Sequence, residues 1–343
     1  MDLRGNMGGR KVRHSGIKAT EKGYPVMLLS LIHILKAVDG VSMKMYKGET
    51  LGLVGESGCG KSTIAYTVVG MYGATSGQVI YDNMDIVKKG YRRTLKQKGD
   101  IQIVFQDPGS SLNSRRTIEK SMEVPLDIHD KMSKEEKEKR VEELLEMVGL
   151  PKDYKNKMPR NIGGGERQLV SVARALATNP ELIILDEPTS ALDVSVQAKV
   201  ISTLIELQKK LELSYLFITH DLSLMRNVAS RVAILYLGRL CELAPTAEFF
   251  QAPLHPYTKM LLSSIPVVTE EEEAMKPDQI VSQGEIPSPV NAPKGCTFHT
   301  RCKDCMEICK TTAPVMVEVA PEHMVCCHKY TAQAIKKEGE TDV

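Results

Sequence analysis

The stretch Thr50–Ser62 decides the fold, and it reads Thr-Leu-Gly-Leu-Val-Gly-Glu-Ser-Gly-Cys-Gly-Lys-Ser. Its mostly apolar first part predicts a buried strand at Thr50–Val54. The next eight residues fit the pattern G-x-x-x-x-G-K-[ST], and we expect a helix to begin near Lys61. A strand, a glycine-rich turn and a helix in this order predict an α/β fold with a phosphate-binding loop at the end of the strand.

The residue types of this loop suit the binding of a nucleoside triphosphate. Glycines let the backbone turn sharply and bring its N–H groups onto phosphate oxygens, and the helix N-terminus adds partial positive charge. Lys61 would reach the β- and γ-phosphates, and the Ser62 hydroxyl would bind Mg²⁺. Cys59 occupies a variable position and reads as a small filler rather than a nucleophile. The predicted nucleotide-binding residues here are Gly55, Glu56, Ser57, Gly58, Cys59, Gly60, Lys61, Ser62 and Thr63.

A second apolar run, Leu182–Leu185, leads directly into the carboxylates of Asp186 and Glu187. A buried strand that ends in an acid holds its carboxylate rigidly, so Asp186 is expected to orient Mg²⁺, through water. Glu187 lies one residue further out, where it would act on the attacking water as general base or positioning group.

The rest of the chain alternates short apolar runs with helical patterns up to about residue 240, which is typical of an α/β domain. We expect strands at Ile101–Phe105, Tyr215–Thr219 and Val232–Leu235, and an amphipathic helix at Ser133–Val148. From Pro245 onward, prolines and loops are expected to dominate.

The composition is that of an ordinary globular protein, with 343 residues, 42% hydrophobic residues and 26% charged residues. This length suggests about two domains. The formal net charge of +2 lacks the basic excess of general nucleic-acid binders, so no nucleic-acid partner is expected. The most apolar run, Val26–Leu35, is too short to span a bilayer and is not followed by a signal-peptide cleavage pattern. We therefore expect an intracellular protein.

Several motifs together resemble the ATP-binding cassette (ABC) ATPases. The run Asp186–Asp193 looks like the Walker B motif and D-loop of that family, and Ala173–Leu176 is similar to the helix after its signature motif. Gln106 resembles the Q-loop glutamine, and His220 the switch histidine. The resemblance implies a P-loop NTPase with a RecA-like core over residues 36–245 and a helical subdomain at about 110–165. Residues 1–35 match nothing in the family and read as a divergent or non-native start.

The resemblance also implies how these residues act. Two nucleotide-binding domains would close head to tail around two ATP molecules. Gln106 would contact Mg²⁺ and the attacking water, and His220 the γ-phosphate. Asp193 would shape the contact between the two subunits. The aromatic residue that stacks on adenine in this family is not identified, because Tyr24 is the only tyrosine upstream of residue 36 and its setting differs.

The signature motif departs from the family pattern Leu-Ser-Gly-Gly-Gln. The aligned residues are Ile162, Gly163, Gly164, Gly165 and Glu166. Gly163 lacks the hydroxyl expected to contact the partner's ATP, and Glu166 brings a carboxylate where a neutral amide is usual. The helix start still offers backbone N–H groups to an anion. The sequence therefore predicts a subunit that contributes poorly to its partner's ATP while keeping its own loop competent.

The tail, residues 246–343, resembles the C-terminal extension of oligopeptide and dipeptide permease ATPases. The likeness lies in Leu254–Lys259, in Gly284–Pro289 and in the cysteines. It implies a subunit that powers peptide import together with a second ATPase chain, identical or different, and two membrane permease subunits, with an extracytoplasmic solute-binding protein acting indirectly. Such a subunit would sit peripherally at the cytoplasmic face of the membrane.

Six of the eight cysteines fall in this tail. In a reducing compartment such a cluster favours metal binding over disulfides. Four thiolates suit an iron–sulfur cluster or zinc, and free or disulfide-bonded cysteines are the third reading. The family pattern selects Cys296, Cys302, Cys309 and Cys327 for a [4Fe–4S] cluster and leaves Cys305 and Cys326 spare.

Three alternative functions stay open. Close relatives of peptide importers carry nickel or other solutes. A non-transport ABC ATPase that acts on DNA or ribosomes would show a long coiled-coil insert, fused tandem cassettes or a basic face, and none is evident. A regulatory module that binds ATP without turnover fits the altered Gly163 and Glu166, but the presence of Glu187 and His220 argues against it.

Overall fold

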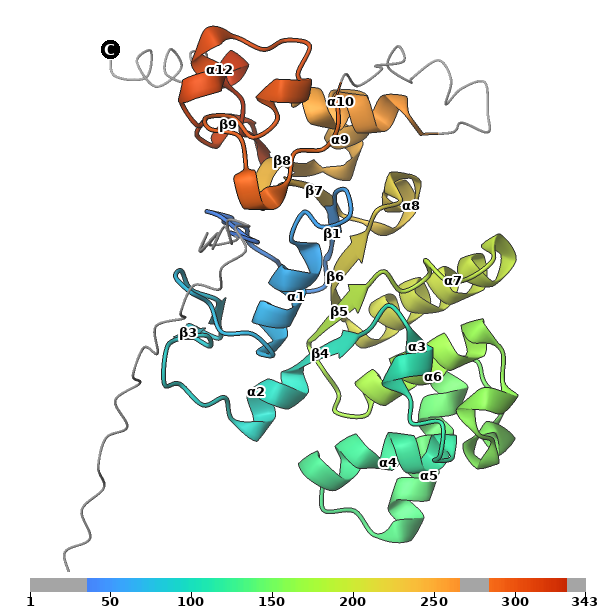
Figure 1. Cartoon of the computed structure of the whole chain (residues 1–343). Coiled ribbons are helices and arrows are strands. Elements are labelled where there is room, and N and C mark those ends of the chain that lie inside the picture. The colour runs from blue at the N-terminus through green and yellow to red at the C-terminus, as the bar shows by residue number, and fades with distance from the viewer. Residues whose placement is uncertain (1–35, 266–283, 332–343) are drawn as a thin grey trace, which may run out of the picture. The chain divides into compact units, whose positions relative to one another are not determined.

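The computed structural model describes residues 36–265 and 284–331, and an eight-stranded sheet runs through this part of the chain (Figure 1). The strand order is β4-β5-β6-β1-β7-β8-β10-β9. The strands are β1 (Thr50–Val54), β4 (Ile101–Val104), β5 (Leu182–Asp186), β6 (Ser214–Thr219), β7 (Arg231–Tyr236), β8 (Arg239–Pro245), β9 (Val317–Ala320) and β10 (His323–Val325), and a separate hairpin consists of β2 (Ile80–Tyr81) and β3 (Met84–Asp85).

Strands β4, β5, β6, β1 and β7 are parallel and form the part of the sheet that the sequence predicts. Successive residues of a strand point to opposite faces, and here both faces are buried. In β6, for example, Phe217 packs into one hydrophobic cluster, whereas Leu216 and Ile218 pack into the other. This explains why these strands read as continuous apolar runs. Their carboxyl ends meet at one edge of the sheet, next to the loop that follows β1.

Helices cover the two faces of the sheet. Ile64 of α1 belongs to one cluster, while Leu169 of α6 and Leu204 of α7 belong to the other. The helices are α1 (Lys61–Val69), α2 (Leu95–Asp100), α3 (Pro108–Ser111), α4 (Ile118–His129), α5 (Lys134–Met147), α6 (Gly164–Leu176), α7 (Val194–Leu211), α8 (Leu222–Val228), α9 (Thr246–Gln251), α10 (Pro256–Ser263) and α12 (Glu307–Thr311), with 3₁₀ turns η1 (Lys152–Asn156), η2 (Pro159–Asn161), η3 (Pro289–Asn291) and η4 (His299–Arg301).

The helical segment between β4 and β5 contains α3 to α6, drawn in green in Figure 1. Helix α5 begins where the sequence predicts it, because Ser133 and Glu136 form a reciprocal capping box. Its apolar stripe, Val141, Leu144 and Leu145, is fully buried. These contacts join α5 to α4 and α6, which contribute to the same hydrophobic cluster.

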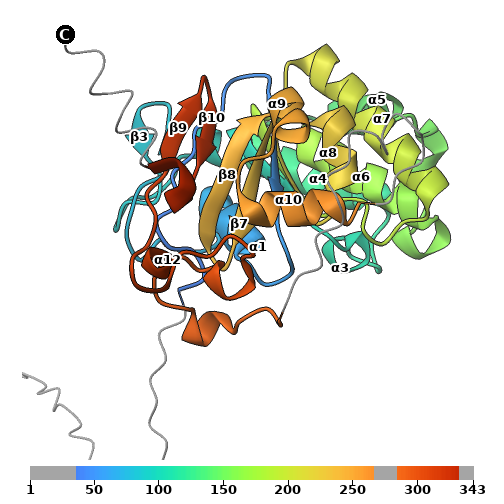
Figure 2. The same cartoon turned by 90° about the horizontal axis from the view of Figure 1, so that it is seen from above.

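The end of the chain is more regular than the sequence predicts. Residues after Pro245 form α9 and α10, and β9 and β10 add two antiparallel strands to β8 (Figure 2). Regular elements therefore interrupt the loops that the sequence predicts here. Buried Glu242 on β8 explains the attachment, because its carboxylate accepts hydrogen bonds from the backbone N–H groups of Leu254 and His255 and lies 2.8 Å from His323 Nε2 on β10.

Within the described residues, no helix has the length and apolar character needed to cross a bilayer. The described residues, 36–265 and 284–331, belong to one compact unit. The phosphate loop and the cysteine-containing tail are therefore parts of the same structure. Tyr24 and the apolar run 26–35 lie outside the described residues.

Candidate functional site

The loop between β1 and α1 is held in a shape that needs glycine. Gly60 has a φ of 107°, and a Cβ atom there would lie 2.3 Å from the Ala37 carbonyl oxygen. A Cβ atom on Gly55 would lie 2.2 Å from the carbonyl oxygen of Leu235 on β7. Side chains at these positions would displace the backbone, so the glycines permit the close wrapping that a phosphate cradle requires.

Lys61, the first residue of α1, turns back toward this loop. Its side chain is buried, and its Nζ donates to the carbonyl oxygens of Gly55 (2.7 Å) and Glu56 (3.1 Å). Cys59 beside it is also buried, and burial raises the pKa of its thiol. This fits a packing residue rather than a nucleophile. The ammonium of Lys61 is thus placed at the centre of the loop.

Ser62 and Asp186 bring two oxygen donors together from separate elements. The Ser62 hydroxyl donates to Asp186 Oδ1 over 3.2 Å, which joins the start of α1 to the end of β5. Burial raises the pKa of Asp186, with the neighbouring Glu187 acting in the same direction and the Ser62 hydrogen bond opposing it. A hard cation with oxygen ligands would offset this burial cost, so the donor set fits Mg²⁺.

Glu187 contacts the other two predicted catalytic residues, Gln106 and His220. Its φ of 47° is uncommon for a residue with a side chain, and its N–H donates to the Ile218 carbonyl of β6. Its Oε2 accepts a hydrogen bond from Gln106 Nε2 at 3.0 Å and lies 3.4 Å from His220 Nδ1. Three strand ends thus place an amide, a carboxylate and an imidazole side by side.

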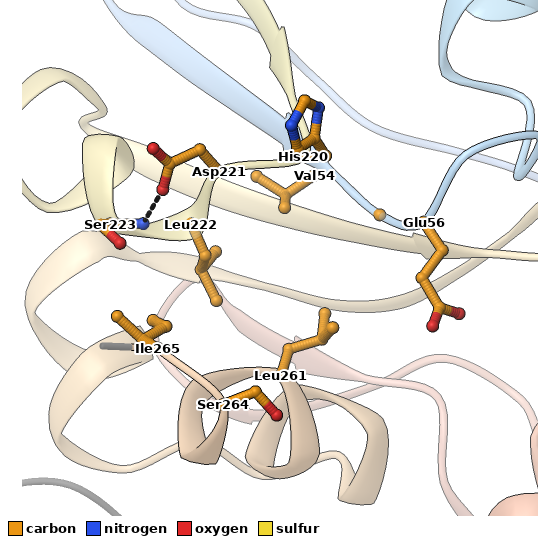
Figure 3. Close-up of a pocket in the computed structure, with 10 residues that line it drawn as sticks. Val54, Glu56, His220, Asp221, Leu222, Ser223, Leu261, Ser264 and Ile265 are labelled. Carbon is orange, nitrogen blue, oxygen red and sulfur yellow. Dashed lines mark hydrogen bonds between the residues drawn. The ribbon is translucent and has the colours of Figure 1, made fainter. Parts of the chain in front are cut away.

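A pocket of about 250 Å³ opens beside this group (Figure 3). It is bounded by the end of β1, the start of α8 and the end of α10. In Figure 3, His220 and Glu56 lie at different borders of the pocket, and the Glu56 carboxylate points away from His220. Glu56 belongs to the phosphate loop, but its side chain turns toward the C-terminal extension.

The signature-like residues form a second polar group at the start of α6. Glu166 closes on its own helix: Oε2 accepts the Gly163 N–H at 2.7 Å, and Oε1 accepts the Tyr154 hydroxyl at 2.6 Å. The Tyr154 bond, with help from that of Gly163, holds the pKa of Glu166 below its usual value. Gly164 and Gly165 continue the helix beside Leu192 and Val196.

Asp193 caps α7, where its carboxylate accepts hydrogen bonds from the Val196 N–H and the Ser195 hydroxyl. In the part of the chain that the structure describes, no hydrogen bond joins Asp193 or the start of α6 to the phosphate loop. The predicted site residues therefore fall into two groups. One group surrounds Lys61 and Glu187, and the other surrounds Glu166.

The cysteines give no ready metal centre. All eight are free thiols. Among the described residues, no three Cys, His, Asp or Glu side chains are arranged to hold a metal ion. Burial raises the pKa of Cys296 to about 11 and that of Cys302 to about 12. The Cys296 N–H donates to the Cys309 carbonyl oxygen at 2.8 Å, but the thiols do not form such a group. This geometry does not support the [4Fe–4S] or zinc prediction.

Sequence reasoning missed three residues that contact the site. Tyr154 binds Glu166, Tyr257 accepts a hydrogen bond from the Glu56 N–H, and Arg301 pairs with the Glu56 carboxylate. Tyr257 and Arg301 both stand in stretches that resemble the C-terminal extension, beside His255 and Cys302, but neither was expected to contact the phosphate loop. Tyr154 carries no motif, and only the fold brings it to Glu166.

Comparison with known families agrees with this arrangement. The family "ABC transporter" matches residues 38–190. The family "Oligopeptide/dipeptide transporter, C-terminal region" matches residues 241–309. The two matches cover the phosphate loop with the strand-end acids, and the start of the extension that reaches Glu56.

Individual proteins are similar over most of the chain. The oligopeptide transport ATP-binding protein AppF of Bacillus subtilis is 49% identical over 298 residues, which are 87% of this chain and 90% of that protein. The oligopeptide transport ATP-binding protein OppF of Salmonella typhimurium is 44% identical over 86% of this chain and 88% of its own length. Among solved structures, the dimeric ATP-binding cassette MJ0796 bound to ADP and Pi is 31% identical with a TM-score of 0.56, over 61% of this chain and 90% of that one.

Proposed function

The chain belongs to the ABC transporter family, and we propose that it is the ATP-hydrolysing subunit that powers peptide import. The observation that carries the proposal is the contact of Glu187 with both Gln106 and His220, at the sheet edge where Ser62 meets Asp186. The oligopeptide transport proteins that the chain resembles supply the substrate class.

The phosphate loop would bind the triphosphate of ATP. Its backbone N–H groups and the N-terminus of α1 attract the phosphate oxygens, and Lys61 adds a full positive charge. Ser62 and Asp186 would hold Mg²⁺, which when bound neutralises charge on the phosphates. These residues position the γ-phosphate and stabilise the charge that develops on it.

The strand-end group would act on the attacking water. Glu187 accepts a proton or orients the water, and the amide of Gln106 restricts where the Glu187 carboxylate lies. His220, which lies beside the Glu187 carboxylate, would donate a hydrogen bond to the γ-phosphate. This division of roles needs no covalent intermediate, because positioning and electrostatics carry most of the catalysis in phosphoryl transfer.

The partners follow from the family. A second ATPase subunit would complete each ATP site with its signature loop, as the dimeric cassette similar to this chain suggests. Two membrane permease subunits would dock near Gln106 and the helical segment, and a solute-binding protein would deliver the peptide outside. The chain would then lie at the cytoplasmic face of the membrane. The altered Gly163 and Glu166 favour a partner ATPase that differs from this chain.

For the tail we keep the [4Fe–4S] cluster on Cys296, Cys302, Cys309 and Cys327 as a proposal, with zinc as the alternative. Its support is the residue pattern together with the free state of all four thiols. Iron, sulfide and zinc analysis of anaerobically purified protein, with its visible absorption spectrum, decides between them. Protein that contains neither metal would end the proposal.

The experiment that tests the proposed function is import of a labelled peptide into vesicles that carry the reconstituted transporter. The wild-type chain is expected to support ATP-dependent uptake, and Glu187→Gln to lose both uptake and hydrolysis while still binding ATP. Glu248→Gln is a matched control, because Glu248 is an exposed acid on α9. Uptake that does not depend on ATP, or a Glu187→Gln variant with full activity, would contradict the proposal.

A further inference from the structure

Every polar group of Glu56 in the phosphate loop is engaged by a different residue. Its carbonyl oxygen accepts from Lys61 Nζ, within the loop itself. Its N–H donates to the Tyr257 hydroxyl at 3.3 Å. Its carboxylate lies 3.0 Å from Arg301 Nη1. Tyr257 and Arg301 both belong to the C-terminal extension, so two of the three restraints come from outside the loop.

Arg301 is a buried and well-supported partner. Its side chain is 7% exposed, compared with 23% for that of Glu56. Both terminal nitrogens approach the carboxylate, and Nη1 also lies 3.5 Å from the Tyr236 hydroxyl. The guanidinium is 5.9 Å from the ring centroids of Tyr236 and Phe298. A planar guanidinium in such surroundings is fixed in place rather than sampling solvent.

The aromatic rings around Arg301 connect the extension to the sheet. Tyr236 at the end of β7, Tyr257 at the start of α10 and Phe298 just before η4 have pairwise centroid distances of 4.7, 5.3 and 5.2 Å. Arg301 therefore reaches the phosphate loop from a packed base. These contacts connect the extension to the loop at this point.

The charge of Glu56 matters for ATP. Lys61 donates to the Glu56 carbonyl with the same ammonium that is placed to bind the phosphates, so Glu56 lies directly beside the proposed ATP site. An unpaired carboxylate there would repel a triphosphate and would be free to turn toward it. Pairing with Arg301 neutralises that carboxylate and directs it away from His220.

We propose that Arg301 is a positioning residue for the phosphate loop, and that through Glu56 it makes ATP affinity depend on the C-terminal extension. The inference rests on the proposed function, because it requires ATP to bind this loop. Arg301 touches neither the nucleotide nor the reacting atoms. It holds Glu56, in the first half of the loop, whereas Lys61 and Ser62, at the end of the loop, would contact the phosphates and Mg²⁺.

The test is the affinity for MgATP of the full chain in its transporter complex, measured by displacement of a fluorescent ATP analogue, together with KM and kcat for hydrolysis. Arg301→Gln leaves Glu56 charged and unpaired, so KM and the dissociation constant should rise roughly tenfold with kcat nearly unchanged. Because the defect is electrostatic, it should shrink as the salt concentration rises. Arg301→Lys keeps the charge and should recover part of the affinity.

Rescue separates this role from a purely structural one. The double variant Arg301→Gln/Glu56→Gln removes both charges and should restore affinity to near the wild-type value, although it does not restore the ion pair. Lys329→Gln is the matched control, since it breaks the exposed Lys329–Asp304 pair in the same extension and should leave affinity unchanged.

The outcomes are distinguishable. Wild-type affinity in Arg301→Gln, or a double variant no better than Arg301→Gln alone, would overturn this inference and leave the proposed function intact. A wild-type complex that binds no MgATP would overturn the proposed function itself. Loss of affinity that matches a loss of thermal stability in both the single and the double variant would also count against the inference, because it would indicate a structural role.

Discussion

Asp186 at the end of β5 and Glu166 at the start of α6 are both acids that we place next to ATP, yet their surroundings differ. Asp186 is 2% exposed and accepts a hydrogen bond from the Ser62 hydroxyl, yet burial raises its pKa. Glu166 accepts bonds from Tyr154 and from the backbone of Gly163, which lower its pKa. Burial therefore has the largest effect on the first carboxylate, and hydrogen bonds have the largest effect on the second.

The difference bears on how this chain would contribute to each of the two proposed ATP sites. Around Asp186, polar groups from β4, β5, β6 and α1 converge on one another and suit a cation and a phosphate. At the start of α6, the Glu166 carboxylate accepts a hydrogen bond from the Gly163 N–H. This N–H would otherwise be available to an incoming phosphate. These surroundings support our proposal that the chain holds its own nucleotide and contributes less to the one that its partner holds.

The largest effect should come from the side that we consider competent. His220→Ala removes the hydrogen-bond donor proposed for the γ-phosphate, and ATP hydrolysis by the complex should fall roughly 10²–10³-fold. ATP binding should persist, since Lys61 and the loop are untouched. His328→Ala is the control, because His328 is a partly buried histidine of the tail whose Nε2 lies 2.9 Å from the Thr312 carbonyl oxygen. Hydrolysis that stays near the wild-type rate would remove His220 from the mechanism.

A smaller effect of opposite sign is expected at the start of α6. Gly163 has φ −67° and ψ 168°, and a Cβ atom there would lie 3.5 Å from its nearest neighbour, Glu166 Oε2, so serine fits without strain. Gly163→Ser supplies a hydroxyl to the partner's ATP, and turnover should rise roughly tenfold, the worth of one hydrogen bond to a charged group.

The control for this variant is Gly73→Ser, which adds the same side chain where nothing lies within 4 Å. Steady-state hydrolysis by the complex at saturating ATP is the measurement. An unchanged rate in Gly163→Ser would contradict the proposed difference between the two ATP sites. It would show that glycine at position 163 does not reduce the hydrolysis rate.

The parallel strands and the phosphate loop could be predicted because their signals are local. The apolar runs at Thr50–Val54, Leu182–Leu185 and Tyr215–Thr219 are strands because both faces of the sheet are buried there. The predicted strand at Ile101–Phe105 ends one residue earlier, at Val104. The predicted order of strand ends and polar residues was enough to bring Gln106, Glu187 and His220 together.

Strands β8, β10 and β9, at one end of the sheet, could not be predicted in this way. Strands β9 and β10 are short and partly exposed, and β8 contains Glu242, so none reads as a continuous apolar run. The pairing of β10 with β8 joins residues about 80 positions apart. A pairing at that separation is determined by the whole fold. The contact of Arg301 with Glu56 spans 245 positions and has the same cause.

The smallest effects concern stability, and they should have opposite signs for the two carboxylates. Glu166→Gln weakens the cap of α6 and the bond to Tyr154, and the free energy of unfolding should fall by about 0.5–1 kcal/mol. Asp186→Asn removes a buried charge, and the nucleotide-free chain should gain about 0.5 kcal/mol. Asp153→Asn, at an exposed acid of η1, should change little.

The pH dependence of these changes follows from the two pKa shifts. The contribution of Glu166 is present above the ordinary Glu pKa of about 4.3 and is lost as the pH falls through its lowered folded-state pKa. The burial cost of Asp186 is full above its raised pKa and disappears as the pH falls toward the ordinary Asp value of about 3.9. The gain in Asp186→Asn should therefore shrink on acidification. Chemical denaturation of the nucleotide-free chain at several pH values measures both, and equal signs for the two variants would show that the carboxylates do not differ as their surroundings imply.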